Sequence, residues 1–394
     1  MSEAKIGDIA ELKTGPFGTQ LHSNEYVKSG IPIINVKNIG YGELICNDLD
    51  YVSELTANRL KEHRLLEGDI VFGRKGSIDR HAYISKECSG WLQGSDCIRV
   101  RCLDKKKINP KFLSHFFNLD YVKRQLNAGA VGSTMASMNT DILKRVKVLL
   151  PDIEVQNTIE RVLSTINDKI ANNTSICSDL ESMAKLIYDY WFVQFDFPDE
   201  NGRPYKSSGG KMIWNEELKR EIPEGWEVKH ASDLTKVRTG KEDANFATVD
   251  GNYAYFTCGQ DILKCDFPSF EGRAVLLAGN GDFNVKHYTG KFNAYQRTYV
   301  LIPDDEKYYA LLYIATKEAI KKFVRGSAGS IVKFITLGDV NGISLLDPHD
   351  DNVLKKFNLI LDKIEQIRDE NEQLASLRDF LLPMLMNGQV KVKS

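Results

Sequence analysis

Long hydrophobic runs are missing from this 394-residue sequence. A helix that crosses a bilayer needs about 20 consecutive, mostly apolar residues, and the purely apolar stretches here are far shorter. The first residues, Met1-Ser2-Glu3-Ala4-Lys5, are mostly polar and lead into Gly7 and Asp8 rather than into the apolar region of a signal peptide. We therefore expect a soluble, cytoplasmic protein without a membrane partner.

Cysteine is scarce, and its spacing forms no recognisable pattern. The 7 cysteines are an odd number without a C-x-x-C pair, so the sequence predicts neither a disulfide framework nor a zinc site. The 7 histidines also lack the spacing of metal ligands. We expect scattered free thiols and no metal bound by this chain.

The loops that carry methyl transfer or nucleotide hydrolysis are absent as well. No Pro-Pro pair occurs, although the Asn/Asp-Pro-Pro-aromatic loop of adenine methyltransferases requires one, and no G-x-x-x-x-G-K-S/T loop is present. Asp199 with Glu227 and Lys229 imitates a metal-dependent nuclease, but Asp199 follows Pro198 in a turn-like segment, and such short matches are common by chance. The sequence therefore indicates a protein that is not an enzyme and holds no cofactor.

Acidic and basic residues nearly balance but are unevenly distributed. Residues 1–150 have a net charge of +5 and residues 231–346 of +1, whereas residues 151–230 and 347–394 carry −6 and −2. Two neutral or basic segments thus alternate with two acidic ones. The pattern weakly favours two modules that face an anion, separated by segments that face elsewhere.

The sequence is internally repeated. Ile6-Gly7-Asp8-Ile9-Ala10-Glu11-Leu12-Lys13-Thr14-Gly15 returns 225 residues later as Ala231-Ser232-Asp233-Leu234-Thr235-Lys236-Val237-Arg238-Thr239-Gly240. Gly132-Ser133, before Leu149-Leu150-Pro151, corresponds to Gly329-Ser330, before Leu346-Asp347-Pro348, at an offset of 197. The second block is therefore 28 residues shorter than the first. Each block mixes β-branched runs such as 31–36 and 69–72 with Gly-rich turns and helical patterns at 110–126 and 308–323, which predicts α/β modules.

A helical stretch with a heptad stripe follows each block. Apolar residues recur at alternating steps of four and three, which is the pattern of a coiled-coil seam. The stripes are Ile159, Leu163, Ile166, Ile170, Asn173, Cys177, Leu180, Ala184, Ile187 and Trp191, and Val353, Phe357, Ile360, Ile364, Ile367, Asn371, Leu374, Arg378 and Leu381. One asparagine interrupts each stripe. Asn173 and Asn371 either pair and define the coiled-coil register, or both face solvent where the seam frays.

Five motifs, in order along the chain, resemble one known family, the specificity subunits of type I restriction-modification systems. The motifs are Thr14-Gly15-Pro16-Phe17-Gly18, Gly68-Asp69-Ile70-Val71-Phe72, Leu149-Leu150-Pro151-Asp152-Ile153-Glu154-Val155-Gln156, Tyr190-Trp191-Phe192-Val193-Gln194-Phe195-Asp196-Phe197 and Leu381-Leu382-Pro383-Met384-Leu385-Met386-Asn387-Gly388. The resemblance covers the whole chain. One departure concerns the Glu-Gln pair that usually opens each conserved helix. In the first helix the pair is separated by a valine, in Glu154-Val155-Gln156. The second helix opening has lost the pair and reads His349-Asp350-Asp351-Asn352.

The resemblance implies an α/β (α+β) fold with an internal pseudo-twofold repeat. Two target-recognition domains, 1–151 and 227–347, would be joined by a spacer helix at 152–197, a connector at 198–226 and a second helix with a C-terminal tail at 348–394. Each recognition domain would read half of a bipartite, asymmetric site in double-stranded DNA. The helices would form an antiparallel coiled coil that sets the gap and docks two DNA adenine methyltransferase subunits carrying S-adenosylmethionine. Separate restriction and translocase subunits would use ATP and Mg²⁺.

Polar and basic residues of the Gly-rich loops are the candidate DNA contacts, because Arg, Lys, Gln and Asn pair with base edges while Ser and Thr more often position phosphates. They are Lys37, Asn38, Arg74, Lys75, Ser77, Arg80, Ser133 and Thr134 in the first block, and Arg238, Lys241, Gln260, Arg297, Arg325, Ser327, Ser330 and Lys333 in the second. His81 and His287, which lie near basic residues, are expected at the surface or facing DNA.

The main alternative is a duplicated protein-interaction scaffold whose coiled coil is its working part and which has no DNA specificity. Strong dependence of DNA binding on salt concentration would distinguish the two functions, because phosphate contacts release counterions. A self-contained restriction-modification enzyme is disfavoured by the missing catalytic loops.

Overall fold

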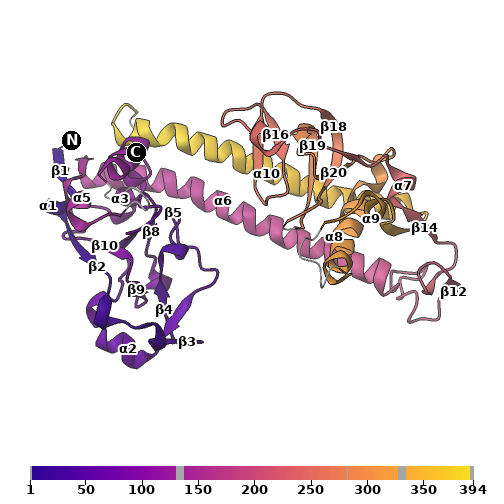
Figure 1. The fold of residues 1–394 in the computed structure, drawn as a ribbon, viewed down its shortest axis with the longest axis horizontal. Coiled ribbons are helices and arrows are strands. Elements are labelled where there is room, and N and C mark those ends of the chain that lie inside the picture. The colour runs from indigo at the N-terminus through magenta and orange to yellow at the C-terminus, as the bar shows by residue number, and fades with distance from the viewer. Residues whose placement is uncertain (1, 130–136, 282, 327–333, 391–394) are drawn as a thin grey trace. The chain divides into compact units, whose positions relative to one another are not determined.

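The computed structural model describes residues 2–129, 137–281, 283–326 and 334–390 (Figure 1). Within these residues, helices and mixed sheets divide into two compact units. The first unit is Met1–Ala171 together with Glu372–Ser394, and the second is Asn172–Asn371. The predicted mixed α/β class with two sheet-containing modules and long helices is confirmed. Each unit contains part of both long helices.

The first unit contains a five-stranded sheet in the order β2-β10-β7-β8-β5 and a four-stranded sheet in the order β3-β6-β4-β9. The strands of the larger sheet are β2 (Ala10–Thr14), β5 (Tyr41–Gly42), β7 (Ile70–Gly73), β8 (His81–Tyr83) and β10 (Cys97–Cys102). Those of the smaller sheet are β3 (Tyr26–Val27), β4 (Ile31–Ile34), β6 (Asp50–Val52) and β9 (Leu92–Gln93). The short helices are α1 (Ile6–Ile9), α2 (Glu54–Arg59), α3 (Pro110–Phe117), α4 (Asp120–Ala128) and α5 (Thr140–Arg145).

The second unit contains a six-stranded sheet in the order β15-β20-β18-β19-β16-β17. Its strands are β15 (Arg238–Thr239), β16 (Tyr253–Phe256), β17 (Ile262–Cys265), β18 (Phe270–Ala278), β19 (Val285–Ala294) and β20 (Thr298–Leu301). The helices are α7 (Ala231–Leu234), α8 (Tyr309–Gly326) and α9 (Leu337–Asn341). The connector forms a separate hairpin of β12 (Met212–Asn215) and β13 (Arg220–Pro223).

The two main sheets have the same topology. The orders β2-β10-β7-β8-β5 and β15-β20-β18-β19-β16 correspond strand by strand, and in each the last pair, β5 with β8 or β16 with β19, is parallel while the others are antiparallel. Each block is also closed by pairing of its first and last strands. These are β1 (Ser2–Lys5) with β11 (Lys147–Leu150), and β14 (Glu227–His230) with β21 (Ser344–Asp347). In the described part of the second block the four-stranded sheet has no counterpart, which accounts for most of the difference in length.

Equivalent glycines show why the opening motif repeats. A Cβ atom at Gly15 would lie 1.8 Å from the carbonyl oxygen of Gly94, and one at Gly240 would lie 1.8 Å from that of Ala294. Neither position tolerates a side chain, because the neighbouring strand passes too close. The Gly15 amide donates to the carbonyl of Cys97, and the Gly240 amide donates to the carbonyl of Thr298. The same hydrogen bond therefore fixes the turn in both blocks.

Two long helices, α6 (Ile153–Tyr188) and α10 (Asp351–Met386), provide the heptad stripes. In the first unit the start of α6, with Ile159 and Leu163, shares a core with the end of α10, including Leu382 and Leu385. In the second unit Glu181 of α6 bonds Arg368 of α10, whereas the earlier Asn173 bonds the later Asn371. The helices therefore pair in an antiparallel sense, as the coiled-coil prediction requires.

The two interrupting asparagines meet in the second unit. Asn173 is only 1% exposed. Its amide nitrogen donates to Asn371 Oδ1 at 2.9 Å and to a Glu370 carboxylate oxygen at 2.7 Å. A buried amide is costly unless it is hydrogen-bonded, and here the opposite helix supplies the acceptors. The alternative in which both asparagines face solvent is wrong.

A buried amide also anchors each block to its long helix. Gln156 of α6 accepts the amide N–H of Asn109, which caps α3, and donates to the carbonyls of Lys107 and Pro151. In the second unit Asn358 of α10 accepts the N–H of Ala310 in α8 and donates to the Glu306 carbonyl. The first turn of α10 has no glutamine equivalent to Gln156. Asn358, which lies further along α10 and has a shorter side chain, makes the anchoring hydrogen bonds instead.

Candidate nucleic-acid interface

The β7–β8 hairpin and the β18–β19 hairpin present equivalent tip loops, residues 74–80 and 279–284. In the first unit the Arg74 amide donates to the carbonyl of Asp96 at 2.7 Å, and the Arg74 carbonyl accepts the amide of Met138 at 2.9 Å. In the second unit the Gly279 amide donates to the carbonyl of Arg297 at 2.8 Å, and the Gly279 carbonyl accepts the amide of Ile335 at 2.9 Å. The backbone frame around the two loops is therefore the same.

The side chains on this shared frame differ. Loop 74–80 carries Arg74, Lys75 and Arg80, whereas the described part of loop 279–284 carries no Lys or Arg. In the neighbouring turns the charges are reversed: the first block has the acidic Asp96 where the second block has the basic Arg297. One scaffold thus presents a different arrangement of donors and acceptors in each block, and such differences allow two modules to recognise different base edges.

In the second unit the frame borders two adjacent hollows of about 660 Å³ and 240 Å³. Thr239 and Tyr299 line both. The larger is also lined by Val237, Arg238, Lys241, Ser269, Phe270 and Leu337, and the smaller by Gly279, Asn280, Gln296, Arg297, Phe334 and Ile335. Three predicted contacts, Arg238, Lys241 and Arg297, are therefore brought together on the β15–β20 side of the sheet.

The other predicted contacts of the second block are more scattered. Gln260 is exposed beside a loop whose carbonyls, at Cys258 and Gly259, accept hydrogen bonds from Asn284 and Lys286. Ser327, Ser330 and Lys333 lie outside the described residues, as does the side chain of Arg325. Arg238 additionally stacks over the Phe270 ring at 5.5 Å, which orients its guanidinium beside the larger hollow.

In the first block two of the four predicted cations, Lys37 and Lys75, already have an acidic partner. Lys37 bonds Asp48 at 2.8 Å and Asp50 at 3.2 Å, and the bond to Asp48 raises the pKa of Lys37. Lys75 pairs with Asp96 at 3.0 Å. These pairs are exposed, so their separation by a DNA phosphate costs little.

A cationic cluster lies around Tyr41 in the same block. Arg80 is placed 5.6 Å and Lys123 4.6 Å from the centre of the half-exposed Tyr41 ring. Arg74 is partly buried and Ser77 is exposed at the loop tip. Ser133 and Thr134 lie outside the described residues.

Asn38 is a correction to the predicted contacts. Its side chain is fully buried, donates to the carbonyl of Ile45 and accepts the amide N–H of Asn35. The side-chain oxygen of Asn38 thus holds the turn that begins at Asn35, and its nitrogen holds the following loop, so the amide does not face a ligand. A Gly-rich, polar neighbourhood does not distinguish a loop-stabilising asparagine from a base-reading one.

His81 and His287 are corrections for the same reason, because both are buried. His81 donates from Nε2 to the Ser114 carbonyl, and burial lowers the pKa of His81 to about 3. His287 bonds Glu365 through Nδ1, while Arg368 donates to Nε2. Since arginine only donates, Nε2 is the acceptor and His287 is neutral, in agreement with a pKa lowered mainly by burial.

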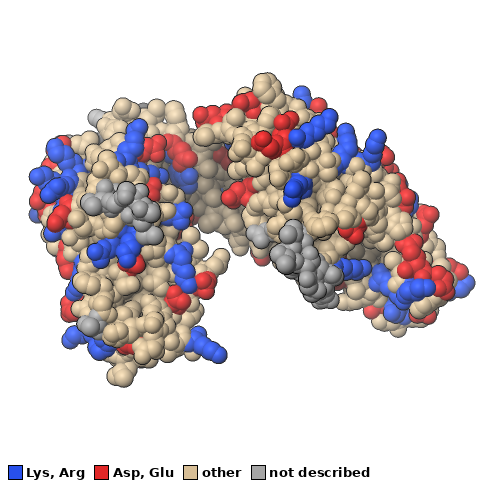
Figure 2. Space-filling view, in the orientation of Figure 1, with Lys and Arg blue, Asp and Glu red and all other residues tan. Residues whose placement is uncertain are grey.

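Sequence reasoning missed Tyr41, Asp96, Asn280 and Gln296 as members of this interface. The last two line the smaller hollow, and Asp96 occupies the position of Arg297. The correspondence of Asp96 with Arg297 depends on strand register. The sequence repeat does not reveal this register, because it is recognisable only at the opening motif and at the two Gly-Ser pairs. Figure 2 shows Lys and Arg interspersed with Asp and Glu on the visible face of each unit.

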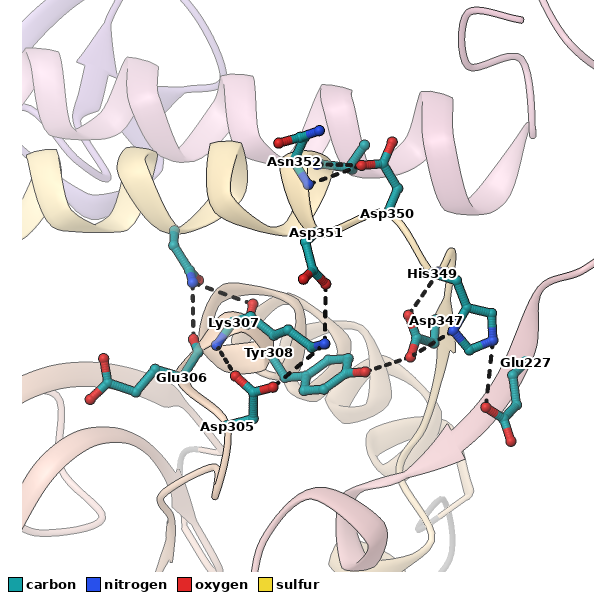
Figure 3. A network of polar contacts seen from close by, with 12 residues as sticks. Glu227, Asp305, Glu306, Lys307, Tyr308, Asp347, His349, Asp350, Asp351 and Asn352 are labelled. Atoms are coloured by element: carbon teal, nitrogen blue, oxygen red, sulfur yellow. Dashed lines mark hydrogen bonds and ion pairs between the residues drawn. The ribbon is translucent and has the colours of Figure 1, made fainter.

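Glu227, one of the nuclease-like residues, lies in a polar network with His349 and Asp347 (Figure 3). Glu227, Asp347 and His349 come close enough together to hold an ion. Asp347, however, already accepts hydrogen bonds from Tyr308 at 2.5 Å and from the His349 amide, and it pairs with Lys229 at 3.1 Å. Burial alone would raise the pKa of Asp347, but these donors outweigh it and lower the pKa. The charge of the Asp347 carboxylate is thus already balanced by Lys229. Asp199 is paired with Arg203 within its own turn.

One face of α6 in the second unit is apolar yet exposed. Leu186 is 70% exposed, and the exposed apolar residues recur at the spacing of one helical face. They are Ile176, Met183 and Leu186 of α6 together with Tyr190 and Val193 of the π-helical segment Asp189–Val193 that continues it, and we refer to them as the α6 stripe. The stripe lies beside the seam positions, not on them, so the contact with α10 leaves it uncovered.

Comparison with known proteins identifies the family. The family model for the type I restriction modification DNA specificity domain matches residues 1–182 and 223–346, which together make up most of the chain. The chain therefore belongs to the specificity subunits of type I restriction-modification enzymes, as the resemblance predicted. The names of its relatives agree with a DNA-recognition component that is not itself the catalyst.

Two relatives and one solved structure illustrate the match. The EcoDI specificity subunit of Escherichia coli is 38% identical over 43% of the chain, but this covers only 39% of that relative. The MjaIX specificity subunit of Methanocaldococcus jannaschii is 25% identical over 99% of the chain and 93% of its own length. The S subunit crystal structure from M. genitalium matches with a TM-score of 0.60 at 17% identity, covering 98% of this chain and 95% of that one, and supports the fold.

Among the described residues, no helix combines the length and apolar character that a bilayer-crossing segment needs.

Proposed function

We propose that each block of this chain reads one half of a bipartite, asymmetric DNA site. The observation that carries the proposal is the shared backbone frame with different side chains. Two identical modules would favour identical half-sites, whereas Lys75 and Asp96 in one block and Asn280 and Arg297 in the other present different hydrogen-bonding groups.

The helices supply the proposed spacer and the proposed docking surface. Each contains 36 residues, a length of about 54 Å at 1.5 Å per residue. Half-sites one helical turn apart are separated by about 34–36 Å along the duplex. The α6 stripe offers apolar side chains to a protein partner, and two adenine methyltransferase subunits are the proposed occupants. S-adenosylmethionine would be bound by those subunits, and ATP and Mg²⁺ by restriction and translocase subunits.

The test is a map of methylated adenines in the host chromosome, with and without this chain. We expect a two-part motif that disappears on deletion and returns when the full-length chain is restored. The rival scaffold function predicts no change in the motif set. Binding of the purified chain to DNA should also weaken steeply with salt, since counterions are released at phosphate contacts.

A further inference from the structure

We propose that Arg297 and its structural equivalent Asp96 are specificity-determining residues, each reading one base pair in a different half-site. This inference rests on the proposed function and names the residues through which each block acts. It assigns guanine recognition to Arg297 and recognition of the cytosine amino group to Asp96.

The two residues occupy the same position in the same turn. Residues 94–97 form a turn in which the Cys97 amide donates to the Gly94 carbonyl, and residues 295–298 form one in which the Thr298 amide donates to the Tyr295 carbonyl. Each turn leads directly into a central strand, β10 or β20. Asp96 and Arg297 are the third residues of these turns, and their carbonyls accept the equivalent tip-loop amides of Arg74 and Gly279.

Hydrogen bonds on several sides hold this position rigidly. The turn is bonded to the opening motif through Gly15 or Gly240, to the hairpin tip through Arg74 or Gly279, and onward to Met138 or Ile335. A side chain on such a frame starts from a defined place, so little conformational freedom of the backbone is lost when it contacts DNA. This distinguishes position 96/297 from an ordinary surface charge.

The surroundings of Arg297 are those of a recognition pocket. Its hollow of about 240 Å³ also contains the amide-bearing residues Asn280 and Gln296 and the half-buried ring of Tyr299. Arginine donates two parallel hydrogen bonds to the O6 and N7 acceptors of guanine in the major groove. The neighbouring amides suit adenine, so the hollow presents several groups that distinguish bases instead of only phosphate-binding lysines.

Asp96 has the opposite chemistry. Its carboxylate pairs with Lys75 at 3.0 Å and remains partly exposed, so the exposed pair is easily rearranged. A carboxylate accepts a hydrogen bond from the N4 amino group of cytosine and repels the acceptor-rich edge of guanine. The freed Lys75 ammonium is then placed to pair with a phosphate or with an adjacent guanine. The exchange of Arg for Asp therefore makes the two half-sites unlike each other.

The experiment uses Arg297→Gln and Asp96→Asn in the full-length chain, each as the cell's only copy. Both changes remove a charge and retain a hydrogen-bonding group; Asn has the shape of Asp, whereas Gln is shorter than Arg. Methylated adenines are mapped in the chromosome, and binding of the purified chains to duplexes that differ at one base pair is then measured. Lys264→Gln is the matched control, because Lys264 is exposed on β17, at the opposite edge of the sheet from β15.

We expect R297Q to relax or change one base pair in one half-site, and D96N to do so in the other half-site. The preference for the original base pair should fall by roughly 5- to 150-fold in each case. The gap and the remaining positions should persist, and K264Q should leave the motif unchanged. Each variant thereby also serves as the control for the other half-site.

Three results would overturn the proposal. The motif could remain unchanged in R297Q, or both variants could alter the same half-site. Alternatively, R297Q could weaken binding equally for all sequences and lower the magnitude of the salt slope by about 1, which identifies a phosphate contact. Thermal unfolding of the purified variants separates a folding defect from each of these results. If the wild-type chain specifies no two-part motif, the proposed function itself fails, and this inference fails with it.

Discussion

Single polar side chains determine how the helices and blocks of this protein are held together. Asn173, Gln156, Asn358 and His287 are all buried, and each bonds a group on another element. A buried hydrogen-bonding group is costly when its partner is removed. These residues therefore favour one arrangement of the elements over shifted ones, which an apolar contact of the same size does less well.

The asparagine pair provides a test at this scale. Replacing Asn173 with Leu removes the donor to both Asn371 and Glu370, whereas replacing Asn371 leaves Asn173 its bond to Glu370. We expect N173L to lower the free energy of unfolding by about 1–3 kcal/mol and N371L by less. The double variant should recover part of the loss while the seam register loosens. Urea unfolding of the four proteins measures this, and strictly additive losses would contradict an energetic coupling of the two amides.

His81 makes stability depend on pH. Because burial lowers the pKa of His81 to about 3, the folded protein keeps this ring neutral, while the unfolded chain protonates it below about pH 6.5. The folded state binds fewer protons, so the contribution is complete above pH 6.5 and is lost as the pH falls toward 3. At pH 5 the loss is about 2 kcal/mol. His81→Gln should reduce the difference in unfolding free energy between pH 7 and pH 5 by that amount. An unchanged difference would show that His81 is not the titrating group.

At the scale of elements, the two long helices have a double role. Their seams pack in the cores of the units, and their polar faces bond the blocks through residues such as Glu365, Arg368 and Asn358. The α6 stripe remains outside these contacts. An element that belongs to the core and also offers an exposed apolar face can position a block and receive a partner at once.

A heptad insertion tests the proposed spacer role. Adding seven residues to α6 and to α10 at matched positions retains the seam and lengthens each helix by about 10 Å, or about three base pairs. We expect the gap of the methylated motif to change while both half-sites are retained. Methylation mapping reports the gap directly. If the gap stays the same, the helices do not measure it.

At the scale of the whole molecule, duplication explains both the shared topology and the difference in readout. The same strand order and the same closing strand pairs recur. Among the residues that the structure describes, the four-stranded sheet occurs only in the first block and β17 only in the second. Variation is thus concentrated in the tip loops and in the inserted strands. A frame that tolerates such variation allows one block to change specificity without disturbing the other.

A block exchange tests this independence. Replacing residues 231–346 with the matching block of a relative should change one half of the methylated motif and leave the other half and the gap intact. The exchange begins directly after β14 and ends within β21, so β14 and its partner Asp347 stay native while residues 344–346 of β21 come from the relative. Methylome sequencing of cells carrying the chimera gives all three quantities. A change in both half-sites would contradict independent reading.

The duplicated layout, the mixed fold class, the heptad seams and the family could all be predicted from the sequence alone. These depend on periodicity and on ordered motifs, which survive without knowledge of long-range contacts. It also identified Arg238, Lys241 and Arg297, because charge in a Gly-rich loop is visible locally. The individual contacts to DNA remain predictions.

The folded structure was needed to identify which polar residues face inward and which positions of the two blocks correspond. Asn38, His81 and His287 are buried because distant carbonyl, carboxylate and guanidinium groups satisfy them, and those partners are between 7 and 81 residues away in sequence. The equivalence of Asp96 with Arg297 and of Gln156 with Asn358 likewise depends on strand register and helix packing. Hydrogen-bond partners are selected by proximity in space, and proximity is a property of the folded chain that local patterns do not encode.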